Sequence, residues 1–326
     1  MPDGDRLRRV RRAAVPVLLL FLVALAVPLL ARHDPTEQRD AAAARKRPPG
    51  TLLHAVHLAD GRWRLADRVE RTPEGLEIER LGRIETVAAD RVTNLTADGV
   101  DEQVVFLLGT DGLGRDVLAR ILYGARVSLL VGLLAMAMAL TLGALVGAVA
   151  ALGGPWMDGL LMRSVDAFLA FPALFLLLTL TALFEPSTWL LVLVLGVTSW
   201  MGVSRLVRSE VLGLARRDFV TAARATGQHP GLVFWRHLLP NAWGPILVQA
   251  TLLVADMILI ESALSYLGFG IQPPTPSWGN MIYEGRAFFP DAWWLSVLPG
   301  GAIAVTVVSF NLLADRLRDA LDPRVP

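Results

Sequence analysis

The chain has 326 residues, of which 54% are apolar and 19% are charged, and its formal net charge is +1. The mean hydropathy of +0.49 is too high for an ordinary soluble protein, and the near-neutral charge provides no general attraction for nucleic acid. The absence of cysteine excludes disulfides, thiolate catalysis and cysteine-ligated metals.

Apolar blocks long enough to cross a membrane recur along the chain, since about 20 apolar residues span the hydrocarbon core. Five blocks carry no charge: 13–31, 127–157, 167–184, 186–204 and 292–314. A sixth block, 242–264, is long enough but contains Asp256 and Glu261. Because backbone groups in lipid must be hydrogen-bonded internally, we predict an all-α membrane protein with six transmembrane helices.

Arginines indicate how these helices are oriented. Arg6, Arg8, Arg9, Arg11 and Arg12 precede the first block, which places the N-terminus in the cytoplasm. That block is longer than the apolar segment of a signal peptide and lacks a clear cleavage site after it, so we expect an uncleaved span over 1–31. Six spans return the C-terminus to the cytoplasm, on the same side as the arginine-rich loop 205–240.

The region 32–108 is predicted to lie outside the cytoplasm as a linker followed by a small β-rich insert. Asp60-Gly61 lies between two strand-like runs and indicates a hairpin. The stretch 75–87 alternates apolar and polar residues, which predicts one half-buried strand. His54 and His57 are three apart, so in a strand they point to opposite faces and we expect no metal site.

The loop 205–240 carries the signals of a short, well-defined helix. Asp218 is a candidate N-cap, Gly227 suits the left-handed position after the last turn, and Pro230 suits the first turn of a second short helix. A helix of two turns is unstable alone. It is therefore either a plain surface connection between two spans or an element that docks into a groove on a cytoplasmic partner.

One face of this short helix favours docking. Phe219, Ala222, Ala223 and Thr226 follow the i, i+3, i+4 spacing. They give one aromatic side chain and two methyl-sized side chains, and small residues allow another backbone to approach closely.

Motifs for enzymatic chemistry are missing from the sequence. The single lysine, Lys46, does not stand in a phosphate-binding P-loop, and the zinc-protease and serine-hydrolase motifs are absent. We therefore expect a non-catalytic chain that binds no cofactor. If transport by this chain is driven by ATP, the ATPase must be another polypeptide.

The stretch FVTAARATGQHPGLVFWRHLLPN (219–241) resembles the EAA loop of ABC importer permeases, which contacts the ATPase subunit. Thr221 stands where the family usually has glutamate, and His237 occupies the usual isoleucine position. The resemblance implies an ATPase-coupling loop formed by Phe219, Thr221, Ala222, Ala223, Arg224, Gly227, His237, Leu239 and Pro240.

Three further stretches resemble the C-type permeases of dipeptide and oligopeptide importers. They are GTDGLGRDVLARILYGARVSL (109–129), ESALSYLGFGIQPPTPSWGNM (261–281) and SFNLLADRLRDALDPR (309–324). The resemblance implies a type I permease core over 109–326 in a bacterial inner membrane. It also implies a second homologous permease, two ATPase subunits that hold ATP and magnesium, and an extracytoplasmic solute-binding protein. Related importers take dipeptides, longer peptides, nickel chelates or other small solutes.

Charged residues inside or beside the spans have two interpretations. Glu261 and Asp256 either line the translocation pathway or make inter-helix or interfacial contacts, because a charge near the bilayer centre costs roughly 2.5–3.5 kcal/mol. Asp158, Arg163 and Asp166 are expected to anchor or pair rather than relay protons. Asp111, Arg115 and Asp116 are expected to fix an outer turn, with Arg115 pairing locally and Asp116 capping the next helix.

Two other functions compete with an ATP-driven importer. A secondary transporter or channel would need buried ion ligands and internal repeats, and only Asp256 and Glu261 are candidates for the ligands. A membrane scaffold would merely display the outer insert. Neither alternative explains the four resembling stretches together.

Overall fold

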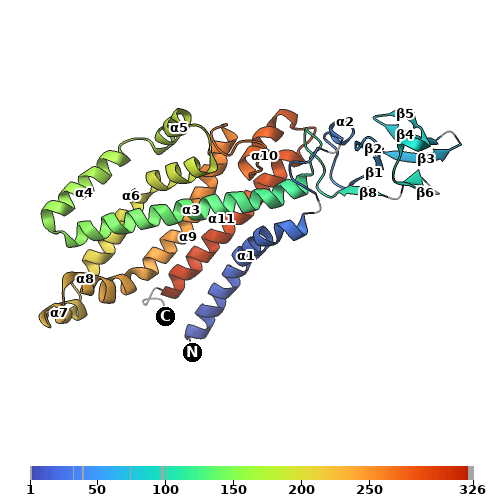
Figure 1. The fold of residues 1–326 in the computed structure, drawn as a ribbon. Helices are drawn as coiled ribbons and strands as arrows, with labels where there is room; N and C mark the ends of the chain where they lie inside the picture. Colours follow the sequence, from blue (N-terminus) through green and yellow to red (C-terminus); the bar gives the residue numbers. More distant parts are fainter. Residues whose placement is uncertain are drawn as a thin grey trace. The chain divides into compact units, whose positions relative to one another are not determined.

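The computed structural model describes residues 2–31, 33–38, 40–73, 75–96, 99–100 and 102–321, drawn as a ribbon in Figure 1. The chain divides into two compact units. The helical unit comprises Met1–Leu22, Val127–Gln272 and Ile303–Pro326. The mixed unit comprises Val23–Arg126 and Pro273–Ala302.

Most of the described chain is helical. The longer helices are α1 (Pro2–Leu30), α3 (Val117–Leu152), α4 (Gly154–Leu169), α5 (Ala173–Leu183), α6 (Thr188–Leu214), α9 (Leu239–Tyr266) and α11 (Trp294–Leu321). Among the described residues, five helices are long and apolar enough to cross a membrane, the fourth being Pro230–Tyr266. A sixth crossing is obtained if the bent pair α4 and α5 is counted as one span.

The prediction of one helix over 167–184 is wrong. Helix α4 ends at Leu169, α5 begins at Ala173, and the two helices are bent by 78°. Pro172 explains the break, because proline has no N–H to donate and disfavours helical backbone at the residue before it. The block 127–157 is likewise divided, since α3 ends at Leu152 and Gly154 adopts a φ of +85°.

Helices α3, α6 and α9 pack closely in the helical unit. A Cβ atom on Gly147 would lie 2.4 Å from the Ser204 carbonyl oxygen, and one on Gly143 would lie 2.5 Å from the Val203 Cβ. Glycines therefore bring α3 and α6 into backbone contact, as small residues do between membrane helices. The apolar core includes Leu195 of α6 and Met257 of α9.

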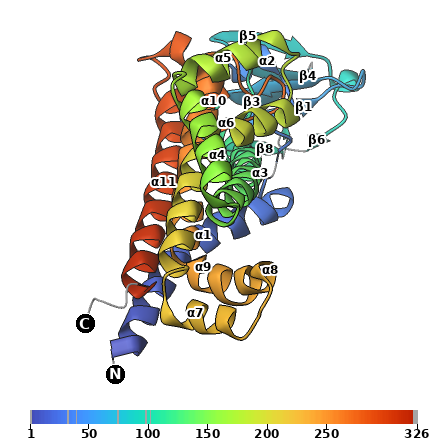
Figure 2. The ribbon, with the colours of Figure 1, turned by 90° about the vertical axis from the view of Figure 1, so that its left-hand side faces the viewer.

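Two short helices lie at one end of α6 and α9. They are α7 (Asp218–Ala225) and α8 (Pro230–Val233), and the π-helical turn η2 (Phe234–Leu238) joins α8 to α9. Figure 2 shows α7 and α8 side by side, and both views place them toward the same end of the helical unit as the start of α1 and the end of α11.

The mixed unit contains the described strands, all paired antiparallel. Strands β1 (Thr51–His57), β2 (Trp63–Ala66) and β8 (Gln103–Phe106) form a sheet in the order β2-β1-β8. Strands β3 (Arg68–Thr72), β4 (Gly75–Arg80) and β5 (Arg83–Val87) form a second sheet, and β6 (Leu95–Thr96) pairs with β7 (Gly99–Val100). Helix α2 (Ala41–Ala44), the 3₁₀ turns η1 (Ala89–Arg91) and η3 (Arg286–Phe288), and helix α10 (Trp278–Gly285) complete the unit.

Two hairpins can be compared with the sequence predictions. Around Asp60-Gly61, β1 and β2 pair with His57 opposite Trp63. Over 75–87 the structure has two strands rather than the one expected, because Leu81 and Gly82 turn the chain with φ values of 54° and 71°. Both residues in the left-handed region suit a tight hairpin turn, and leucine at the first position concealed that turn. No group of metal-ligating side chains occurs among the described residues.

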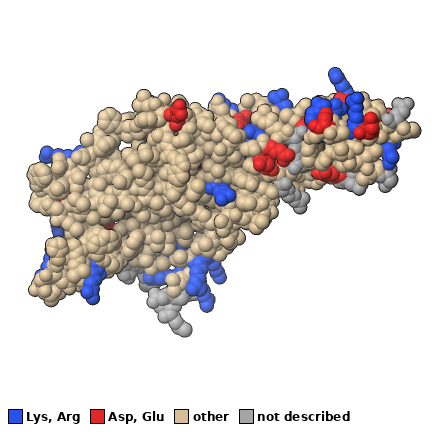
Figure 3. Space-filling view, viewed as in Figure 1, with Lys and Arg blue, Asp and Glu red and all other residues tan. Residues whose placement is uncertain are grey.

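Charged side chains are unevenly distributed. On the face drawn in Figure 3, they gather over the strands, while the helical unit is largely free of them between its ends. A long surface without charges is what a helix bundle presents to lipid.

Candidate functional site

Helix α7 begins one residue earlier than the sequence suggested. Arg217 has extended backbone and is the N-cap residue, without a side-chain capping bond, and Asp218 is the first helical residue. The expectation that Asp218 caps the helix is therefore wrong. The N–H groups of Val220 and Thr221 donate to the Arg217 carbonyl at 3.0 and 3.2 Å. The Asp218 carboxylate lies in the first turn, where the positive end of the helix dipole stabilises its negative charge.

The C-terminal end of α7 is closed by Gly227, as expected. Gly227 has a φ of +78°, and its N–H donates to the Arg224 carbonyl at 2.9 Å. The N–H of Gln228 donates to the Ala223 carbonyl at 3.3 Å. This pair of bonds is a Schellman motif, which satisfies carbonyls that a helix end otherwise leaves free.

One face of α7 is buried in the helical core and the other is exposed. Val220 is 0% exposed and Ala223 is 7% exposed, and both belong to the apolar core of the helical unit. Phe219 is 41% exposed, and Ala222 and Thr226 are exposed. The predicted face is therefore partly wrong, since Ala223 supports the helix from inside. Val220, the bulkiest aliphatic residue of α7, was the signal for the buried side.

The exposed residues of α7 form the surface that a partner would meet, called here the docking surface. Its members within α7 are Asp218, Phe219, Thr221, Ala222, Arg224 and Ala225, and the exposed Thr226 follows directly after the helix. Thr221, which stands at the usual glutamate position, donates from Oγ1 to the Arg217 carbonyl at 3.4 Å. The substitution thus leaves a small hydroxyl on the docking surface where a carboxylate is usual.

Pro230 and Pro240 shape the chain between α7 and α9. Pro230 occupies the first turn of α8, as expected. The N–H of Leu239 donates to the carbonyl of Phe234, five residues earlier, which is a π-type bond. Pro240 explains this wide turn, because its ring needs room beside the carbonyl of the preceding turn and it has no N–H to donate.

His237 links this turn to α7. Its Nε2 lies 3.1 Å from Gln228 Oε1, and its ring centroid lies 6.5 Å from that of Phe219. The carbonyl of His237 accepts a bond of 2.7 Å from Asn241 Nδ2. His237 therefore stabilises both the end of α7 and the π turn, a role that no local sequence pattern indicated.

Two ion pairs hold α4 against α6. Arg208 forms a bidentate pair with Asp158, with Nη2 at 2.5 Å from Oδ2, and Arg205 pairs with Asp166. The expectation that these aspartates anchor rather than relay protons agrees with this geometry, although their arginine partners were not foreseen. Arg163 is exposed.

The two carboxylates of α9, Glu261 and Asp256, lie in different environments. Glu261 is 0% exposed and accepts hydrogen bonds from Ser265 Oγ at 2.7 Å and from Ser128 Oγ of α3 at 3.0 Å. It therefore joins α3 to α9 inside the helical core. Asp256 is exposed, and no hydrogen bond or ion pair reaches it from the described part of the chain.

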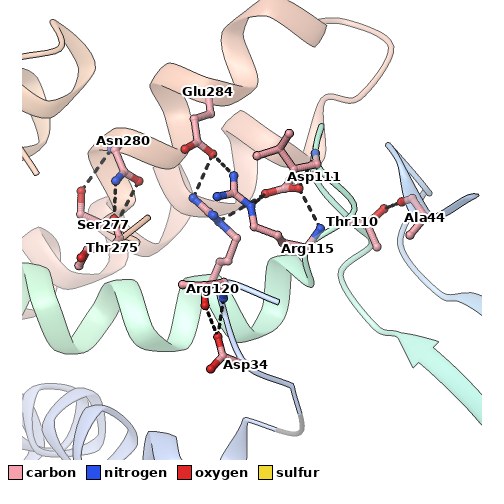
Figure 4. A network of polar contacts seen from close by, with 12 residues as sticks. Asp34, Ala44, Thr110, Asp111, Arg115, Arg120, Thr275, Ser277, Asn280 and Glu284 are labelled. Carbon is pink, nitrogen blue, oxygen red and sulfur yellow. Dashed lines mark hydrogen bonds and ion pairs between the residues drawn. The ribbon is translucent and has the colours of Figure 1, made fainter. Parts of the chain in front are cut away.

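A network of four charged side chains, three of them buried and Glu284 partly exposed, lies in the mixed unit (Figure 4). Arg115 contacts Asp111 and Glu284, each at 2.6 Å. Arg120 contacts Glu284 at 3.0 Å and Asp111 at 3.6 Å. The predicted local pairing of Arg115 is confirmed, whereas Glu284 of α10 was not foreseen. Two positive and two negative groups compensate one another, which burial requires.

The cap expected at the start of α3 is present. Asp116 Oδ1 accepts from the Leu118 N–H at 2.9 Å, the bond that an N-cap makes to the second helical residue. Its other oxygen lies 2.7 Å from His33 Nδ1.

The family model described as "Binding-protein-dependent transport system inner membrane component" matches residues 139–326. The chain belongs to this family. It is therefore an inner-membrane permease subunit of an ABC importer, and the resemblance seen in the sequence is confirmed. The family match begins after the strands of the mixed unit, and residues 322–324 of the last resembling stretch lie outside the described residues.

Named relatives of this permease are transport proteins. A Brucella suis biovar 1 (strain 1330) protein with a provisional peptide permease name is 44% identical over 66% of this chain and 72% of its own length. The dipeptide transport system permease protein DppC of Alkalihalophilus pseudofirmus is 42% identical over 67% of this chain and 71% of its own. The di/tripeptide transport system permease protein DppC of Pseudomonas aeruginosa (strain UCBPP-PA14) is 42% identical over 68% of this chain and 74% of its own length.

A solved structure shares the fold of this permease. A chain of the MetNI methionine ABC transporter, in an inward-facing conformation, aligns with a TM-score of 0.54 at 16% identity. The alignment covers 62% of this permease and 96% of that chain. The helical core is therefore of the type I importer kind.

Proposed function

We propose that this permease and a second homologous permease form the translocation pathway of an importer for dipeptides or oligopeptides. The names of the relatives from three organisms support this cargo. Two ATPase subunits, which hold ATP and magnesium, bind the loop 205–240 and drive the change between outward-open and inward-open states. An extracytoplasmic binding protein delivers the cargo, and this chain itself catalyses no reaction.

The observation that carries the proposal is the construction of α7. The helix is closed by Gly227, held in the core by Val220 and Ala223, and exposed along Phe219 and Ala222. A short helix supported from behind transmits force as a rigid element, which an unsupported helix of two turns cannot do. The remaining residues of the coupling loop have defined parts in this arrangement: Thr221 and Arg224 are on the docking surface, His237 is in the π turn, and Leu239 and Pro240 begin α9 directly after that turn.

The proposed topology has six spans, with α4 and α5 together making the third. The arginines before α1 and in the loop 205–240 support a cytoplasmic location for both termini and for α7. The start of α1, the end of α11 and α7 lie toward one end of the helical unit, which agrees with that arrangement. The strands of the mixed unit then form an extracytoplasmic insert. Glu261 contributes inter-helix contacts beside the pathway.

The proposal is tested by the composition of the native complex. The tagged chain is extracted in mild detergent and the co-purifying proteins are identified by mass spectrometry. We expect P-loop ATPases and a second permease. Recovery of the chain alone, under conditions that keep a known importer intact, would favour an ion-coupled transporter instead.

The docking surface is tested by Ala222→Glu, which places a long charged side chain on it. We expect ATPase binding to weaken by about 30-fold or more, because disruption at the centre of an interface typically costs about 2 kcal/mol or more. Ala89→Glu, at an exposed alanine of η1, is the matched control and should bind normally. Normal uptake with tight ATPase binding in the Ala222→Glu variant would refute the assignment.

A further inference from the structure

Asp256 is an acidic side chain that no hydrogen bond or ion pair reaches from the described residues. It lies in α9 between Ala255, which is 1% exposed, and Met257, which is also 1% exposed, yet it is exposed itself. The contrast with Glu261, which two hydroxyls reach within 3.0 Å, shows that α9 satisfies one carboxylate internally and presents the other outward.

The position of Asp256 along α9 places it inside the hydrocarbon layer. It follows Ala242 by 14 residues and precedes Leu264 by eight, which at about 1.5 Å per residue gives roughly 21 and 12 Å to the ends of the apolar stretch. A short aspartate side chain cannot reach water over either distance. Since a charge facing lipid there costs roughly 2.5–3.5 kcal/mol, Asp256 faces either a water-filled space or a partner.

The face of α9 that carries Asp256 is mixed: Leu252 and Leu259, four and three residues away, are apolar, and polar or small side chains lie seven residues away. Gln249 precedes it by seven residues and Ala263 follows it by seven, so all three lie on one side of the helix. Gln249 is partly exposed and Ala263 is exposed. The face thus carries an amide and a carboxylate two turns apart with leucines between them, and polar groups of this kind belong on a path for a hydrated solute rather than on a surface that faces only lipid.

We infer that Asp256 lines the translocation pathway and binds the protonated amino group of the peptide cargo. The inference rests on the proposed function and specifies the chemistry of its pathway. Every unblocked peptide carries an α-amino group with a pKa of about 7.7–8.0, so most of it is protonated at neutral pH. A charge-assisted hydrogen bond to that ammonium group would compensate both charges in the membrane interior. With no fixed cation from the described chain beside it, the carboxylate stays free to exchange one cargo molecule for the next.

Accessibility of position 256 tests whether it lines a pathway. Because the chain has no cysteine, a single substitution introduces its sole thiol. Asp256→Cys is assembled with cysteine-free partner subunits in proteoliposomes and treated with a membrane-impermeant methanethiosulfonate. Ala255→Cys is the buried control. Leu247→Cys is the exposed control, at 46% exposure and nine residues away, which is half a helical circumference.

We expect the thiol at position 256 alone to be modified and saturating peptide to protect it. If the complex transports peptide but the thiol at 256 is as unreactive as that at 255, the inference is wrong. If the thiol is unreactive and Asp256→Asn separates the two permeases, the carboxylate belongs to a subunit interface, which also overturns the inference.

The charge is tested by comparing Asp256→Asn with Asp256→Glu. For Asn we expect about tenfold less peptide taken up per ATP hydrolysed, the size of change produced by losing one charge-assisted contact. Glu should recover most of the uptake, which a purely structural role would not predict. Uptake by the Asn variant at the wild-type ratio would overturn the inference while leaving the proposed function intact. Failure of the wild-type chain to assemble with ATPases would instead refute the proposed function.

Discussion

Replacing Gly227 by alanine should destabilise α7 without creating a steric clash with any neighbouring side chain. Gly227 has a φ of +78°, and a Cβ built on it meets no atom within 4 Å. The cost is therefore confined to the backbone, at about 1–2 kcal/mol for an L-residue in the left-handed region. Alanine also reduces the entropy of the open chain, which offsets roughly 0.4–1 kcal/mol.

The net destabilisation of α7 is therefore about 1 kcal/mol. This corresponds to a roughly fivefold larger fraction of molecules in which α7 is locally unfolded. Hydrogen exchange of the amides in α7, measured on the purified chain, should accelerate by that factor in Gly227→Ala. Binding of the ATPase should weaken in parallel, because the open helix must close before it docks. Gly227→Asn should exchange more slowly than Gly227→Ala, since asparagine tolerates the left-handed region better.

Gly213→Ala supplies the matched control. Gly213 lies in α6 and does not have a positive φ, and a Cβ placed on it would meet no atom within 4 Å. Alanine there should leave α7 unchanged and favour α6 slightly, because alanine is the better helix former. If Gly227→Ala exchanges no faster than wild type, the Schellman motif does not hold α7 and the explanation of its rigidity fails.

Two predictions concern buried carboxylates and their partners. Glu261→Ala leaves the Ser128 and Ser265 hydroxyls without their acceptor, so the thermal midpoint in detergent should fall, whereas Glu261→Gln should retain most of it; equal midpoints would contradict the inter-helix role. Arg115→Met removes one of two cations from the network in the mixed unit and should destabilise that unit by about 3–5 kcal/mol. Denaturant unfolding measures this loss, and a change below about 1 kcal/mol would show that the network contributes little.

The features predicted best were those dictated by a single residue. Gly227, Pro230 and Asp116 each have a backbone or capping preference that needs no tertiary information, and the structure uses each as expected. Pro172 carried a similar signal. The span over 167–184 was predicted from the length of an uncharged apolar block, and that length takes no account of the N–H that proline lacks. The break between α4 and α5 was therefore overlooked although the sequence contains its cause.

The features missed were those that depend on distant partners. Glu284 completes a network with Arg115, 169 residues away in sequence, and no local pattern pairs them. Ala223 was assigned to the docking surface because its size suits a close approach. The same small size suits the core, and only packing against the rest of the helical unit decides between the two environments.

The strands of the mixed unit form a module whose two ends meet. The N–H of Gly50 donates to the carbonyls of Phe106 and Leu107 at 3.0 and 3.1 Å. Outside this junction, the N–H of Lys46 donates to the Asp111 carbonyl at 2.9 Å, and the N–H of Thr110 donates to the Arg47 carbonyl at 3.0 Å. The residues that anchor the module thus lie outside the strands and would remain if the strands were removed.

Replacing residues 51–106 by a short glycine-serine linker should therefore preserve the permease core. Closely spaced ends make such an excision structurally mild, and the family match at 139–326 leaves the strands outside the shared core. Asp40, which pairs with Arg80 of β4, would regain water rather than remain as a buried charge. We expect the shortened chain to co-purify with the ATPases and the second permease as the full chain does. Loss of that assembly would show that the strands support the core. Retained assembly with lost peptide uptake would assign them to receiving cargo from the binding protein.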